Sequence, residues 1–152
     1  PERFAQVADA LAAKGYKTVF FGGSMDEEMV KEATALMTTK PIIATGRFTI
    51  GQLAAAMQRC SLIITNDSGP MHVAISQKVP IVAMYGPSSP ELYGPYTKDA
   101  TIVTAMPPCT GCAKGMKHEC EDMQCMTRLT VEQVLEAAEK WLGNCKTENM
   151  KE

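Results

Sequence analysis

Helical segments alternate with short apolar runs along most of this 152-residue chain, and this alternation restricts the fold more than any other feature. The runs most typical of buried strands lie near residues 18–22, 62–66 and 81–85, and weaker ones lie near 42–44 and 100–104. A helical segment separates each strong run from the next, so these strands should pair in parallel through right-handed crossovers. The sequence therefore predicts an α/β fold, a Rossmann-like doubly wound parallel sheet with helices on both faces.

Capping signals and apolar spacing locate the helices. The acidic residues 26–28 are typical of the first turn of a helix. The expected apolar face of that helix consists of Met29, Ala33, Leu36 and Met37. Thr49 should cap a third helix, and Thr130 with Gln133 forms a capping box for the last one.

Composition indicates a single soluble domain that does not bind nucleic acid. A chain of this length can bury one core of ordinary size. The formal net charge is −2 and the Lys and Arg residues are scattered, whereas a nucleic-acid surface needs a basic stripe. No segment approaches the ~20 uninterrupted apolar residues of a membrane span. We expect the folded domain to cover residues 1–145, and the polar segment 146–152 to be a disordered tail.

The candidate ligand site is the segment 66–72, Asn-Asp-Ser-Gly-Pro-Met-His, between a strand and a helix. Small hydrogen-bonding residues at a helix N-terminus can hold a phosphate, with Gly69 permitting close approach and Ser68 offering a hydroxyl. His72 lies about one turn into the helix and could donate to a phosphate oxygen. Alternatively, Asp67 or Ser68 merely caps the helix and His72 is a half-buried histidine.

A second glycine-bearing turn strengthens the functional interpretation. Gly86-Pro87 follows the next strand, so in a parallel sheet it should lie at the same edge, beside the first turn. Two such turns would face one crevice. A nicotinamide-binding Rossmann domain is disfavoured, because the Gly22-Gly23-Ser24 turn does not continue as G-x-G-x-x-G.

The segments 66–72 and 79–87 together resemble the signature of the lipopolysaccharide heptosyltransferase family. Gly22-Gly23 and the acidic residues 26–28 occupy the place of the family's strand-end glycines and acidic helix start. The segment 109–126, followed by the helix that begins at 130–132, resembles the family's closing portion, so the resemblance covers nearly the whole chain. It implies the C-terminal half of a two-domain GT-B type glycosyltransferase, built from two facing Rossmann-like halves.

The resemblance also implies the reaction and the partners. The C-terminal half binds a nucleotide diphosphate sugar, commonly ADP-heptose, and the N-terminal half binds a lipopolysaccharide-type acceptor. The sugar is transferred with inversion at the anomeric carbon and without a required cofactor. The catalytic base, and a first strand with a Lys near the donor phosphates, are expected upstream of Pro1. The fragment alone should bind weakly and catalyse nothing. A cytoplasmic enzyme is implied, with membrane contact only at the inner face through the acceptor.

Transferring the family's functional residues by position yields a donor-binding set and no catalytic residue. Residues at the diphosphate and sugar would be Asp67, Ser68, Gly69 and His72, with Gly86 in the neighbouring turn. Glu27 or its neighbour Asp26 would contact the ribose, and Phe48 would lie near the base.

Four of the six cysteines fall in one segment, namely Cys109, Cys112, Cys120 and Cys125. They could supply four thiolates to a structural zinc, with His118 as a substitute ligand, as in a zinc-binding α/β interaction module. The second pair is spaced unusually for a zinc site, so buried sulfurs or a disulfide are alternatives, and an iron–sulfur cluster is disfavoured. Because these cysteines follow the last strand, such a zinc should be remote from the Asp67 turn.

Overall fold

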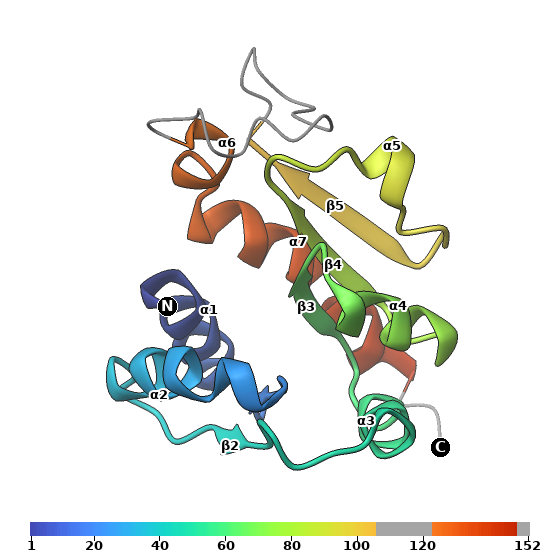
Figure 1. Ribbon diagram of the computed structural model, residues 1–152. Coiled ribbons are helices and arrows are strands. Elements are labelled where there is room, and N and C mark those ends of the chain that lie inside the picture. Colours follow the sequence, from blue (N-terminus) through green and yellow to red (C-terminus); the bar gives the residue numbers. More distant parts are fainter. Residues whose placement is uncertain (106–122, 149–152) are drawn as a thin grey trace. The chain divides into compact units, whose positions relative to one another are not determined.

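The structure is a computed structural model that describes residues 1–105 and 123–148 (Figure 1). The chain divides into two compact units, Pro1–Leu53 and Ala54–Glu152. Each unit is described separately below. The boundary between them falls within α3 (Ile50–Met57).

The first unit combines two helices with a small parallel sheet. Its elements are, in chain order, α1 (Glu2–Ala13), β1 (Val19–Phe20), the 3-10 helix η1 (Ser24–Asp26), α2 (Glu27–Ala35) and β2 (Ile42–Ile43). β1 pairs with β2 in parallel, with Val19 opposite Ile42. α1 packs against α2, and the residues that α1 buries are Ala5, Val7, Ala8 and Leu11.

A carboxylate joins α1 to the chain beyond α2. Asp9 accepts hydrogen bonds from the backbone N–H and the hydroxyl of both Thr38 and Thr39, at 2.5 to 3.0 Å. The Thr38 N–H, followed by the Thr39 hydroxyl, lowers the pKa of Asp9 to about 2. The charged carboxylate is therefore part of what orders this connection.

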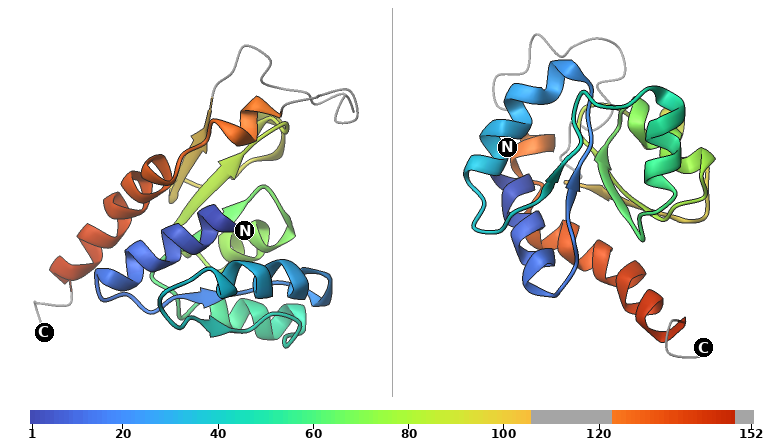
Figure 2. Two further views of the ribbon diagram at one scale, coloured as in Figure 1. Left: turned by 90° about the vertical axis from the view of Figure 1, so that its left-hand side faces the viewer. Right: turned by 90° about the horizontal axis from the view of Figure 1, so that it is seen from below.

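The second unit contains a three-stranded parallel sheet in the order β3-β4-β5. Its elements after α3 are β3 (Ile63–Asn66), α4 (Gly69–Ser76), β4 (Ile81–Tyr85), α5 (Pro90–Tyr93), β5 (Ala100–Thr104), α6 (Gln124–Thr127) and α7 (Val131–Glu148). α4 packs on β3 and β4, while α7 packs on β4 and β5 (Figures 1 and 2). Figure 2 shows these two helices on opposite sides of the strands. Every residue of the central strand is buried, as a continuous apolar run predicts.

The predicted strands and their parallel pairing are confirmed, and so is the α/β class. The strands were expected in one sheet, whereas the hydrogen-bonded strands form two sheets. Helix–strand alternation predicts the direction of pairing, but it does not specify which strands are neighbours.

The helix boundaries are mostly as expected. At the start of α7, the Thr130 N–H donates to Gln133 Oε1 at 2.9 Å and the Gln133 N–H to Thr130 Oγ1 at 3.3 Å. The same reciprocal pair forms between Thr49 and Gln52 before α3. α7 extends to Glu148, so it includes the first three residues of the segment 146–152 that was expected to be a tail. Residues 149–152 lie outside the described part of the chain.

The predicted apolar face of α2 is partly wrong. Val30 and Ala33 are buried, whereas Met29 is 60% exposed and Leu36 is 53% exposed. The helix ends at Ala35, so Leu36 no longer continues its buried face. Sequence periodicity identified the helix but not the direction in which its core lies.

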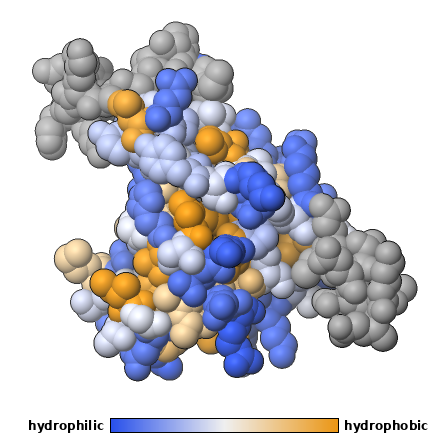
Figure 3. Space-filling model, turned by 90° about the vertical axis from the view of Figure 1, so that its right-hand side faces the viewer, coloured by the Kyte–Doolittle hydropathy of each residue, from blue (hydrophilic) through white to orange (hydrophobic). Residues whose placement is uncertain are grey.

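The surface is mixed in character. On the face drawn in Figure 3, apolar side chains gather in small groups separated by hydrophilic ones. No helix within the described residues is both long and apolar enough to cross a bilayer.

Candidate functional site

The turn between β3 and α4 presents an uncapped helix N-terminus. Ser68 is the N-cap residue, with an extended backbone, but its side chain makes no capping hydrogen bond. Its hydroxyl donates back to the Asn66 carbonyl at 3.2 Å and lies 3.3 Å from Thr65 Oγ1. Ser68 thus holds the N-cap position without a side-chain hydrogen bond to the helix, so the alternative in which its side chain merely caps the helix gains no support. The first-turn N–H groups of α4 therefore remain unscreened by these side chains.

Gly69 is the first residue of α4, and the space that a side chain would occupy there is empty. No heavy atom lies within 4 Å of the point that a Cβ would occupy. Among the described residues, none accepts the Gly69 N–H. Pro70 has no N–H, and the Met71 N–H already donates to the Ser68 carbonyl at 3.1 Å. The Gly69 N–H is therefore a first-turn donor on an exposed residue that has no acceptor among the described residues.

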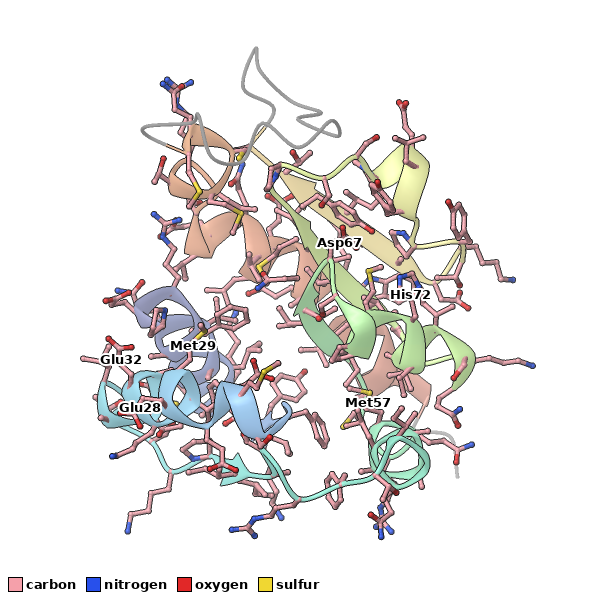
Figure 4. The ribbon with its side chains drawn as sticks, in the orientation of Figure 1. Glu28, Met29, Glu32, Met57, Asp67 and His72 are labelled. Carbon is pink, nitrogen blue, oxygen red and sulfur yellow. The ribbon has the colours of Figure 1, made fainter. Side chains whose placement is uncertain are left out.

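The two ends of this turn carry the predicted polar side chains, Asp67 after β3 and His72 on α4 (Figure 4). His72 is exposed, so the alternative of a half-buried structural histidine is wrong. The Asp67 N–H donates to the Met84 carbonyl at 3.2 Å, which continues the β3–β4 ladder into the turn. The turn is thereby held at the carboxyl edge of the sheet.

The turn after β4 lies at the same edge but is closed on its Cβ side. Gly86 is buried, and a Cβ there would overlap Met126 Sδ and lie 3.0 Å from Met126 Cγ. Cys125 Sγ is 3.8 Å from the same point. The predicted adjacency of the two turns is confirmed, but the expectation that both open on one crevice is wrong for this side of Gly86. Its lack of a side chain allows α6 to pack against the turn.

Tyr85, the last residue of β4, lies beneath these turns and was not identified from the sequence. It is fully buried, and its hydroxyl donates to the Gly94 carbonyl and approaches Met71 Sδ at 3.5 Å. Burial raises the pKa of Tyr85 to about 12, and the nearby Asp67 carboxylate and Tyr96 add to the effect. Its position at the end of an apolar run offered no signal beyond core packing.

In the first unit, the ends of β1 and β2 meet beside the start of α2. The Gly46 N–H donates to the Gly22 carbonyl at 2.9 Å. Gly46 has a φ of +69°, and a Cβ there would overlap Glu27 Oε1. Glycine is thus required by the backbone conformation and by the close approach of the carboxylate. The acidic helix start therefore lies against Gly22 and Gly46 at the ends of these strands.

The two candidate ribose-binding residues, Asp26 and Glu27, differ in the hydrogen bonds that their carboxylates already accept. The Gly23 N–H donates to Asp26 Oδ2 at 2.8 Å, so Asp26 serves the backbone turn before η1. Glu27 is exposed, and the structure describes no hydrogen bond or ion pair from its carboxylate to another described residue. The geometry favours Glu27 as the acceptor that is available to a ligand.

Phe48 belongs to an aromatic pair. Its ring is 42% exposed and its centroid lies 6.3 Å from that of Phe21, with the ring planes tilted by 41°. Phe21 directly follows β1, next to the Gly22-Gly23 turn. Neither Phe21 nor Gly46 was predicted as a site residue. Phe21, directly after β1, cannot be told from an ordinary strand residue, whereas Gly46 in the turn after β2 was a usable signal.

The predicted zinc ligands fall mostly outside the described residues. Cys109, Cys112, Cys120 and His118 lie in the segment that is not described, whereas Cys125 is buried in α6. Within the described ranges, no three His, Cys, Asp or Glu side chains are grouped so as to hold a metal ion. The cysteines were expected to lie far from the candidate site. Cys125, however, adjoins Gly86 at the carboxyl edge of the sheet. The alternative of a zinc-binding interaction module gains no support from the described residues.

Comparisons with known proteins agree with this architecture. Residues 1–123 match the family Glycosyltransferase family 9 (heptosyltransferase). Lipopolysaccharide heptosyltransferase 2 of Escherichia coli (strain K12) is 33% identical over 139 residues, which cover 88% of this chain and 39% of that protein. Lipooligosaccharide heptosyltransferase 2 of Campylobacter jejuni (serotype O:2) is 31% identical over 148 residues, covering 93% of this chain and 45% of that protein.

Two solved structures are similar as well. A glycosyl transferase family 9 protein from Veillonella parvula has a TM-score of 0.85 and 54% identity, over 94% of this chain and 41% of that chain. The E. coli ADP-heptose LPS heptosyltransferase II has a TM-score of 0.81 and 29% identity, over 95% of this chain and 42% of that chain. The chain thus spans about two fifths of the length of these relatives. It belongs to glycosyltransferase family 9, the heptosyltransferase family.

Proposed function

We propose that this chain forms the donor-binding part of a glycosyltransferase that transfers a heptosyl group from ADP-heptose to a lipopolysaccharide-type acceptor. The observation that carries the proposal is the open N-terminus of α4 at the carboxyl edge of the sheet, where Gly69 is uncovered. The donor and acceptor are those in the names of the relatives.

The start of α4 suits the diphosphate of such a donor. The helix dipole and the accessible Gly69 N–H favour an anion, and the missing side chain lets phosphate oxygens approach the backbone. His72 is on the same helix and exposed, so its imidazole can donate to a phosphate or sugar oxygen. In the transfer step, these donors would stabilise the charge that develops on the departing diphosphate.

Two groups within the first unit, considered by themselves, suit a nucleoside. We assign the Glu27 carboxylate to the ribose hydroxyls, because the neighbouring Asp26 carboxylate already accepts the Gly23 N–H. The Phe21–Phe48 pair is assigned to the adenine ring, for which partly exposed aromatic rings offer an apolar contact surface.

The proposed chemistry is a single displacement with inversion. The acceptor hydroxyl attacks the anomeric carbon and loses its proton to a base, while the carbon–oxygen bond to the diphosphate breaks and releases ADP. We assign the base and the acceptor site to sequence outside this chain, so the chain alone should bind ADP weakly and catalyse nothing. The reaction requires no cofactor in this scheme. We place it in the cytoplasm, at the inner membrane face through the acceptor only. A structural zinc on the four clustered cysteines stays a prediction.

Calorimetric titration of the 152-residue chain with ADP, AMP and adenosine tests the proposal. ADP should bind most tightly, because only ADP places a diphosphate at α4. Replacing His72 by Ala should weaken ADP binding by ~1.5 kcal/mol, about tenfold, as for a hydrogen bond to a charged group. Adenosine binding should not change.

The thermal midpoint of the unliganded His72→Ala variant should match the wild type, since the side chain is exposed. Equal affinities of the wild-type chain for ADP and adenosine would contradict the diphosphate site. An unchanged ADP affinity in the variant would remove only His72 from it.

A further inference from the structure

Tyr85 connects two elements at the candidate site through one side chain. Among the described residues, Tyr85 has the largest side chain that is fully buried, so its ring is part of the core of the second unit. Its hydroxyl reaches both the Gly94 carbonyl and Met71 Sδ. Because a carbonyl oxygen is a better acceptor than a thioether, the hydroxyl proton goes to Gly94.

The two contacts of the Tyr85 hydroxyl belong to two different elements near the candidate site. Met71 belongs to the first turn of α4, two residues after Gly69. Gly94 ends α5, in the loop that leaves β4 at Gly86. The Tyr85 hydroxyl therefore links this loop to Met71, which lies in the first turn of α4. Gly94 is itself buried, so its carbonyl depends on a partner within the protein.

We propose that Tyr85 is a positioning residue for the diphosphate site: by binding the Gly94 carbonyl beneath α4, its hydroxyl holds the Ser68–Gly69 turn in the geometry that receives phosphate. This inference rests on the proposed function, because it requires a phosphate ligand at that turn. Without the hydroxyl, the loop must move to solvate Gly94, and the support under Met71 changes with it.

The raised pKa of Tyr85 means that its hydroxyl remains a hydrogen-bond donor over a wide pH range. With a pKa of about 12, the phenol stays protonated at every pH at which a nucleotide is ordinarily assayed. The hydrogen bond to Gly94 is therefore not lost by titration.

Tyr96 provides a matched control in the same loop. Its hydroxyl also donates to a backbone carbonyl, that of Leu92 at 2.6 Å, but its side chain is 71% exposed. Tyr85→Phe and Tyr96→Phe each remove one hydroxyl and keep the ring. Only the first removes the group that lies beneath α4.

The test is titration of the wild-type chain and the two variants with ADP and with adenosine. Tyr85→Phe should raise the dissociation constant for ADP about three- to tenfold, which lies within the range for residues that act without touching a ligand. Its dissociation constant for adenosine should stay within twofold of the wild type. Tyr96→Phe should change neither value. Thermal unfolding of Tyr85→Phe, measured in the same preparation, should show a single cooperative transition that includes the second unit. A loss of affinity confined to ADP in such a folded variant identifies positioning.

Hydrogen exchange of the wild-type chain is a second measurement that does not depend on the variant folding. ADP should slow amide exchange both at residues 68–72 and in the loop 91–96, because the two are joined through Tyr85. Protection of the helix start alone would overturn the inference, as would a folded Tyr85→Phe variant with wild-type ADP affinity. If the wild type itself binds ADP no better than adenosine, the proposed function fails and the inference fails with it.

Discussion

The turns after β3 and β4 sit side by side at one edge of the same sheet, yet their glycines face different surroundings. The Cβ direction of Gly69 is empty, whereas that of Gly86 is filled by Met126 with Cys125 behind it. One glycine leaves a helix N-terminus accessible, and the other makes room for α6. A glycine after a strand can thus serve ligand approach or packing, and the neighbouring element decides which.

Gly86→Ala should cause the greatest loss of stability among these substitutions. The added methyl group would overlap Met126 in a buried turn, and overpacking of this kind costs ~1–3 kcal/mol. Urea denaturation of the chain measures the change in the free energy of unfolding. The Gly69→Ala variant is the matched control, and its stability should stay within ~1 kcal/mol of the wild type, because its methyl group meets open space.

Two further substitution experiments test whether the two glycines differ in this way. Combining Gly86→Ala with Met126→Ala should recover part of the lost stability, because the second change removes the atoms that the new methyl meets. Gly69→Ala should weaken ADP binding while the protein remains folded. Equal destabilisation by the two glycine substitutions would show that the open and closed turns do not differ as described.

A smaller effect should distinguish the two acidic neighbours at the start of α2. Asp26→Ala removes the acceptor of the Gly23 N–H and should cost ~1 kcal/mol of stability, as other losses of a helix-start cap do. Glu27→Gln should leave the thermal midpoint unchanged but weaken adenosine and ADP binding alike, because the ribose is common to both. Reversed outcomes, with Glu27 needed for stability and Asp26 for ligand, would assign the ribose contact to Asp26.

The smallest expected effect lies away from both turns, at Asp9. Its folded-state pKa of about 2 is below its ordinary value of 3.8, so its contribution to stability is present above about pH 4. That contribution is lost as the pH falls through 2. Thermal unfolding between pH 2 and 7 should therefore show that Asp9→Asn lowers the midpoint near neutral pH and matters less in acid. A difference from the wild type that is constant over this pH range would contradict the role of the charge.

Much of the site could be located from local sequence. Asp67, Ser68, Gly69 and His72 are consecutive or nearly so, and a strand–turn–helix pattern places them at a helix start without knowledge of any distant residue. The same holds for the acidic residues 26–28 after Gly22-Gly23. Phe21 was missed because it could not be separated from an ordinary strand residue.

From the amino-acid sequence alone one can predict the positions of the strands, their parallel direction, the Thr49 cap of α3, the capping box of α7 and the family. These features depend on residues a few positions apart, so spacing and residue type suffice to predict them. Parallel direction follows too, because a helix between two strands returns the chain to the same edge.

The tertiary structure was needed to learn which glycine is open, which acidic side chain is already bonded, which side of α2 is buried and how the strands divide between two sheets. It also decided that Tyr85 joins α4 to the loop at Gly94. Each of these outcomes depends on atoms brought together from separate segments, such as Met126 against Gly86. Close packing leaves a given space to one side chain or to a ligand, and the local sequence does not record which of them occupies it.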